Sequence, residues 1–150
     1  MLDNELVSVF AAIAETLFEA ELSVSSSSED TLAPGALTAR IDYRGGFVGA
    51  LQATFDETLA RRLTSMMMKM SPARCTQLDL YDALGEVVNI AAGNLKGLLP
   101  GDCQVTLPYV QDAVSAKREH TPSLLSVQWF VLFGSRLRVE LRGDTVFPSD

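Results

Sequence analysis

The sequence predicts an α+β fold, in which a mostly antiparallel sheet carries long helices packed on one side. Hydrophobic periodicity predicts, in order, one helix, two strands, two helices and three strands. Short turns join the strands of each predicted hairpin, at Gly45-Gly46 and at Gly134-Ser135, so neighbouring strands run antiparallel. With 150 residues, 47% of them hydrophobic, the chain can build one core. We therefore expect a single domain over residues 1–150.

The first predicted element is an amphipathic helix from about Leu2 to Ala20. Residues 23–30 (SVSSSSED), in which only Val24 is apolar, are expected to form a solvated loop. The apolar residues of the helix recur at the spacing of one helical stripe and should face the core: Leu6, Val9, Phe10, Ile13 and Leu17.

Two strands are predicted after this loop, over residues 36–44 (ALTARIDYR) and 47–55 (FVGALQATF). Alternation of apolar and polar residues is typical of strands with one face on a core. The first strand should turn Leu37, Ala39, Ile41 and Tyr43 to one face, and Thr38, Arg40, Asp42 and Arg44 to the other.

A second helix is predicted to begin after Asp56, which serves as its N-cap, and to run to Lys69 or Met70. Ser71-Pro72 should end it, because proline cannot continue a helix. Its inward residues are expected to be Leu59, Leu63, Met66, Met67 and Met70.

A third helix is predicted from Asp79 to Pro100, and it has two contrasting sides. At 100° per residue, Asp82, Glu86, Asn89 and Gly93 lie within about 60° of each other. Gly85, Gly93 and Gly97 lie on or beside this side, where small residues would let another backbone approach closely. The opposite side should face the core with Leu80, Leu84, Val87, Ala91, Leu95 and Leu98.

The C-terminal third is predicted to be mostly sheet. A strand from about Cys103 to Val110 is followed by a polar loop over residues 111–122. Strands over 123–133 and 136–142 then form the second hairpin. The first of these contains VQWFVLF, which is apolar on both faces and would be prone to aggregate at an uncovered sheet edge.

Composition excludes several classes of function. A net charge of −7, with no basic cluster beyond Arg61-Arg62, argues against nucleic acid as a partner. No membrane span or secretory signal is expected, because apolar runs are interrupted well before the length of a span. Cys75 and Cys103 lack the spacing of a zinc site and are expected to be idle thiols of a cytoplasmic protein. The single histidine, His120, falls in a polar stretch and is expected to lie at the surface.

Asp82, Glu86 and Asn89 follow the pattern D-x3-E-x2-N within the run GEVVNIAAGNLKG, with Pro108 expected on the next strand. In this the sequence resembles the CheC/CheX/FliY phosphatases of bacterial chemotaxis, and most closely the CheX-like members with a single site. The pattern occurs only once here. The resemblance implies a CheC-like fold with the site on one long helix.

The resemblance also implies a partner and a reaction. The partner is a phosphorylated CheY-like response regulator, whose aspartyl phosphate is hydrolysed. Asn89 would hold the attacking water and Glu86 would pair with a lysine of the regulator. Asp82 would support the interface, and Gly85 and Gly93 would belong to the binding surface. No cofactor of the chain's own is implied, and Mg²⁺ would be supplied by the regulator's active site.

Two alternatives stay open. The same fold could bind a response regulator or flagellar switch components without catalysis, or the polar helix side could be a contact between two copies of the chain. Family members with a single site pair as dimers through their sheets, so a homodimer that covers residues 123–133 is expected. Otherwise this run is the central strand of a monomer's sheet.

Overall fold

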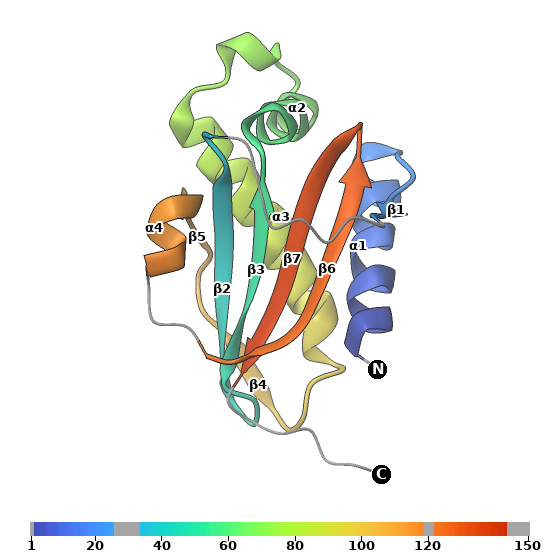
Figure 1. The fold of residues 1–150 in the computed structure, drawn as a ribbon, viewed down its shortest axis with the longest axis vertical. Coiled ribbons are helices and arrows are strands. Elements are labelled where there is room, and N and C mark those ends of the chain that lie inside the picture. Colours follow the sequence, from blue (N-terminus) through green and yellow to red (C-terminus); the bar gives the residue numbers. More distant parts are fainter. Residues whose placement is uncertain (1, 26–33, 119–121, 144–150) are drawn as a thin grey trace.

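The computed structural model describes residues 2–25, 34–118 and 122–143, and it confirms the α+β class (Figure 1). All strand pairs in the seven-stranded sheet are antiparallel, in the order β1-β6-β7-β3-β2-β4, with β5 also paired to β2. In sequence order the elements are α1 (Leu2–Phe18), β1 (Ser23–Val24), β2 (Leu37–Gly45), β3 (Gly49–Phe55), α2 (Glu57–Met68), η1 (Pro72–Arg74), α3 (Gln77–Lys96), β4 (Cys103–Val105), β5 (Tyr109–Asp112), α4 (Ala113–Arg118), β6 (Leu124–Leu132) and β7 (Ser135–Gly143).

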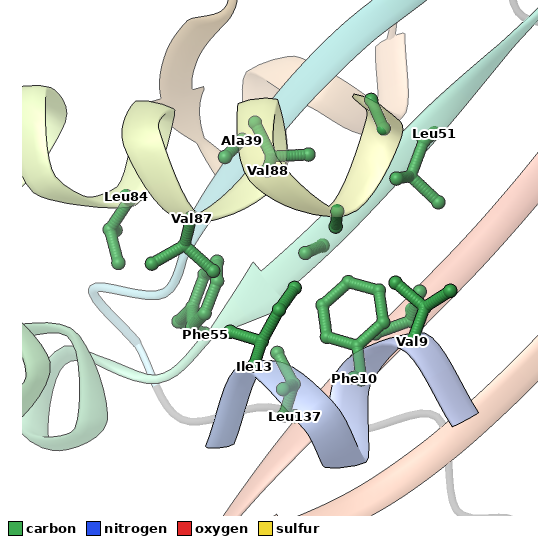
Figure 2. Close-up of a cluster of buried hydrophobic side chains, with 14 of the residues drawn as sticks. Val9, Phe10, Ile13, Ala39, Leu51, Phe55, Leu84, Val87, Val88 and Leu137 are labelled. Atoms are coloured by element: carbon green, nitrogen blue, oxygen red, sulfur yellow. The ribbon is translucent and has the colours of Figure 1, made fainter. Parts of the chain in front are cut away.

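The core lies between the sheet and the helices α1 and α3, which share one side of it (Figure 1). Figure 2 shows the side chains that meet there: Phe10 and Ile13 from α1, Val87 from α3, and Phe55 and Leu137 from the sheet. Burial of this apolar surface stabilises the fold and fixes the position of α3 on the sheet.

The buried side of α1 differs from the predicted stripe at one position. Leu6, Val9, Phe10 and Ile13 are buried as expected, together with Ala14 and Phe18, whereas Leu17 is exposed. Phe18 is 100° from Leu17 around the helix, and it is the larger aromatic ring that reaches the core. The helix ends at Phe18, two residues before the predicted end.

The first hairpin is antiparallel as predicted, with Ile41 of β2 opposite Leu51 of β3, but its turn is longer than Gly45-Gly46, since the last pair is Tyr43 with Gly49. Its polar face is nevertheless buried as well, including Thr38 and Arg40. Ion pairs account for this: Arg40 is 2.8 Å from Asp42. On β7, the Glu140 carboxylate forms ion pairs with Arg138 and Arg142, at 2.9 Å and 2.6 Å. Large polar side chains therefore cover one another on the sheet face opposite the helices.

Helix α2 begins as predicted. The Asp56 carboxylate accepts a hydrogen bond from the Leu59 backbone at 2.7 Å, and Lys69 ends the helix in the left-handed conformation. Leu59 and Leu63 are buried and Met67 and Met70 are half-buried, but Met66 is exposed, contrary to prediction.

The single strand predicted for 103–110 is wrong, since residues 106–108 separate β4 from β5. The polar loop predicted for 111–122 is also wrong in part, because α4 occupies Ala113–Arg118. Asp112 caps α4: its carboxylate accepts from the Ser115 hydroxyl at 2.7 Å and from the Ser115 backbone at 2.8 Å. These hydrogen bonds lower the pKa of Asp112 below its usual value.

The second hairpin turns at Phe133-Gly134 rather than at Gly134-Ser135, and both turn residues have positive φ, 52° and 77°. Two such residues form the turn that suits the twist of a two-residue hairpin. Strand β6 is not central, since only β1 lies beyond it, paired through Ser23 and Val24. The predicted loop over 23–30 is therefore wrong at its first two residues, and residues 26–30 lie outside the described part of the chain.

None of the described helices is long and apolar enough to cross a membrane.

Candidate functional site

Helix α3 is longer at its N-terminus than predicted, because Thr76 caps it. The Thr76 hydroxyl accepts from the Asp79 backbone at 3.2 Å, and the Asp79 carboxylate accepts from the Thr76 backbone at 2.9 Å. This reciprocal pair is a capping box, for which T-x-x-D is the sequence signal. The helix ends at Lys96, so Leu98 lies outside it and is exposed rather than buried.

The inner side of α3 is packed against the sheet and α1, with Leu84, Val87 and Val88 buried (Figure 2). One polar contact joins this side to the sheet: the Tyr43 hydroxyl of β2 donates to the Ala92 carbonyl at 2.8 Å. Burial raises the pKa of Tyr43 well above its usual range, so the hydroxyl stays a donor. These contacts set which side of α3 faces outward.

The outward side carries Asp82, Glu86 and Asn89, and all three side chains are exposed. Spacings of four and three residues place them next to one another along the helix. Within the described residues, none of the three has a hydrogen bond or ion pair to another group. Two carboxylates and one carboxamide are therefore available to an external partner.

The two glycines assigned to the binding surface lie in different surroundings. Gly85 is buried, and a Cβ added to it would lie 3.6 Å from Cγ of Pro108. Gly93 is exposed, with no atom within 4 Å of such a Cβ. Pro108 itself lies between β4 and β5, not on a strand as predicted, and packs on α3 directly beside the polar side chains.

Two exposed leucines near this site were not predicted. Leu78 is 69% exposed and Leu107 is 87% exposed. Leu78 precedes Asp82 by four residues and so lies on the same side of α3. Leu107 is adjacent to Pro108. The helical spacing of residues 78, 82 and 86 could have indicated that Leu78 lies on the exposed side of α3. No such signal existed for Leu107, because its position depends on the contact of Pro108 with Gly85, which is distant in sequence.

The other candidate groups do not gather at this site. Cys75 and Cys103 are both buried free thiols, and His120 lies outside the described residues. Among the residues that the structure describes, no three His, Cys, Asp or Glu side chains come together as a metal site would require.

Comparisons with known proteins match this chain to one family and one fold. Residues 37–128, which include all of α3, match the family described as chemotaxis phosphatase CheX. The CheX protein of Vibrio vulnificus is similar, with a TM-score of 0.71 at 21% identity over 93% of each chain. A comparison with curated protein sequences finds no match.

Two further solved structures share the fold. A CheX-CheY complex with BeF3 and Mg²⁺ from Borrelia burgdorferi has a TM-score of 0.73 at 16% identity, over 93% of this chain and 95% of the other. FliY of Thermotoga maritima has a TM-score of 0.61 at 14% identity, over 95% of this chain and 89% of the other. The arrangement of sheet and helices is thus common to all these proteins.

Proposed function

Because the chain belongs to the CheX family of chemotaxis phosphatases, we propose that it hydrolyses the aspartyl phosphate of a CheY-like response regulator. The observation that carries this proposal is the outward side of α3, where Asp82, Glu86 and Asn89 are exposed and have no partner among the described residues. Similarity in fold to a CheX-CheY complex supports the choice of regulator. A cytoplasmic location is part of this proposal, because the proposed partner is a response regulator.

Asn89 is proposed to position the attacking water. An acyl phosphate hydrolyses unaided, so the main task of a catalyst is to hold water in line with the phosphorus. A carboxamide both accepts from and donates to that water, and it adds no charge to a site that already contains a phosphoryl group. Its rigid helical support limits the geometries that the bound water can adopt.

Glu86 is proposed to pair with a lysine of the regulator. A carboxylate that approaches a phosphoryl group is repelled unless a cation lies between them. The lysine beside the phosphorylated aspartate would provide that cation, and the pair would fix the orientation of α3. Asp82, one turn away, is proposed to contribute supporting contacts, with Gly93 in the same binding surface and Gly85 beneath that surface, where Pro108 packs.

Mg²⁺ is proposed to come with the regulator. Three oxygen donors on one helix side, without ligands from a loop, form a poor cage for a divalent ion. The residues of this chain would hold water and orient the two proteins, and the ion would polarise the phosphoryl oxygens.

A phosphate-release assay tests the proposal and separates it from binding without catalysis. Purified CheY-type regulators are phosphorylated, and loss of the acyl phosphate is followed with and without this protein. Faster release supports a phosphatase. Binding without faster release identifies the chain as a non-catalytic module that recognises a response regulator or a flagellar switch component.

We also propose that residues 1–150 act as one unit that pairs into a homodimer. In the described part of the chain, β1 covers β6 only at Phe130 and Val131, so the edge from Leu124 to Gln128 has no strand beside it. A second copy would cover this edge and leave both α3 helices free for the regulator.

A further inference from the structure

The side chain of Leu107 is exposed, but the residues on both sides of it in the sequence are anchored to the rest of the fold. The preceding residue, Thr106, is joined to β2 by two hydrogen bonds of 3.0 Å with the backbone of Asp42, one from its amide and one to its hydroxyl. The following residue, Pro108, packs on α3 at Gly85. Because both neighbours are anchored, this short connection presents a leucine to solvent with little freedom to retract it.

Leu78, one turn before Asp82, has a comparable support. It lies in the first turn of α3, between Thr76 and Asp79, whose capping box fixes that turn. Leu78 and Asp82 share one side of the helix, four residues apart. Two exposed leucines therefore lie near the polar side of α3: Leu78 one turn before Asp82, and Leu107 next to the proline that packs at Gly85.

Charge at this surface does not favour docking on a phosphorylated protein. The side of α3 that would approach the phosphoryl group carries two carboxylates, and the whole chain has a net charge of −7. Desolvation of ions at an interface largely offsets their attraction. Apolar contact would therefore add affinity, and leucines on an anchored backbone provide it at a smaller cost of ordering than leucines on a mobile loop.

We infer that Leu78 and Leu107 are docking residues that bury their side chains against apolar surface of the regulator's receiver domain, close to its phosphorylation site. This inference rests on the proposed function, since it takes the response regulator as the partner. In it, the leucines add affinity to that of the Glu86 ion pair, and Glu86 and Asn89 determine alignment and rate.

The test compares Leu78→Ser and Leu107→Ser with Leu98→Ser, a control at a leucine that is 51% exposed and lies beyond the end of α3. Two quantities are measured for each variant: the Kd for a CheY-type regulator activated with BeF3 and Mg²⁺, and kcat and KM for phosphate release. Each docking variant should raise Kd and KM about tenfold, with kcat and Tm unchanged. The control should match the wild type.

The outcomes separate this inference from the proposed function. Wild-type affinity in both docking variants overturns the inference and leaves the phosphatase assignment intact. If the wild-type protein binds the activated regulator but releases no phosphate, catalysis is refuted. The ratio of the Kd of each leucine variant to the Kd of the wild type then still tests whether the leucines take part in docking. If the wild type binds no activated regulator, both proposals fail. A fall in kcat without a change in KM would also overturn docking.

Discussion

At the scale of single residues, the three polar side chains of α3 have different proposed tasks because their chemistry differs. Asn89 is neutral and can both donate to and accept from a water. Glu86 needs a cation to approach a phosphoryl group, and Asp82 lies one turn farther toward the N-terminus. All three are exposed, so substitutions there should change activity without disturbing the core.

Asn89→Ala should remove most of the acceleration of phosphate release. Loss of one positioned polar group typically reduces the rate by about a hundredfold, and the unaided hydrolysis of the regulator sets the lower limit. Stopped-flow or radiolabel assays at saturating regulator give the change in kcat, and Tm should equal that of the wild type. Release at the wild-type rate would refute the role of Asn89.

Glu86→Lys should weaken binding to the phosphorylated regulator by about 30-fold or more, because two cations would then face each other at the interface. Titration with the activated regulator measures the effect. Glu15→Lys makes the same change of charge at an exposed position on α1 and serves as the control. Equal affinities of the two variants would contradict the ion pair.

At the scale of elements, α3 is positioned by contacts at several points along its length. The capping box fixes its start, the Tyr43 hydroxyl holds Ala92, and Pro108 packs beside Gly85. The apolar side lies in the core (Figure 2). A catalyst that acts by orientation requires such a rigid support, since small displacements of a bound water lower the rate.

Thr76→Ala should destabilise the protein by about 1 kcal/mol, which corresponds to a fall in Tm of about 2–4 °C for a chain of this size. Urea denaturation and calorimetry measure the change. Thr58→Ala, at an exposed threonine in the first turn of α2, is the control because Thr58 is not an N-cap. If both variants lower the free energy of unfolding equally, the capping box does not contribute significantly to the stability of the protein.

At the scale of the whole molecule, local patterns predicted the architecture because they reflect burial directly. Alternation along β2 predicted an antiparallel hairpin with β3, and Asp56 predicted the start of α2. The helical spacing of apolar residues identified the buried side of α3. The family resemblance, now confirmed, came from the polar residues on the other side of that helix.

Other features depend on contacts that no local pattern contains. The hydrogen bonds of Thr106 to Asp42 interrupt a predicted strand, and they join residues 64 positions apart. Helix α4 has only six residues, too few for periodicity to show. Leucine usually lies in the core, so the exposure of Leu107 could be seen only in three dimensions, whereas for Leu78 the helical spacing to Asp82 was an available signal.

The proposed dimer gives a prediction at this scale. Light scattering at tens of micromolar should find twice the chain mass of 16.2 kDa. Val127→Lys places a charge on the open part of β6 and should yield monomers, because charged residues on edge strands oppose pairing. Val114→Lys on the exposed side of α4 should stay dimeric. A wild-type particle of 16.2 kDa would rule out the dimer.

The hydrogen bond from the Tyr43 hydroxyl to the Ala92 carbonyl has a consequence for how the proposed activity could be controlled. Because α3 is joined to β2 within the core, we expect the amides on its buried side to exchange slowly with solvent. An off state formed by partial melting of the helix would therefore be costly. We expect control of the proposed activity to act by access, through cover and exposure of the outward side of α3.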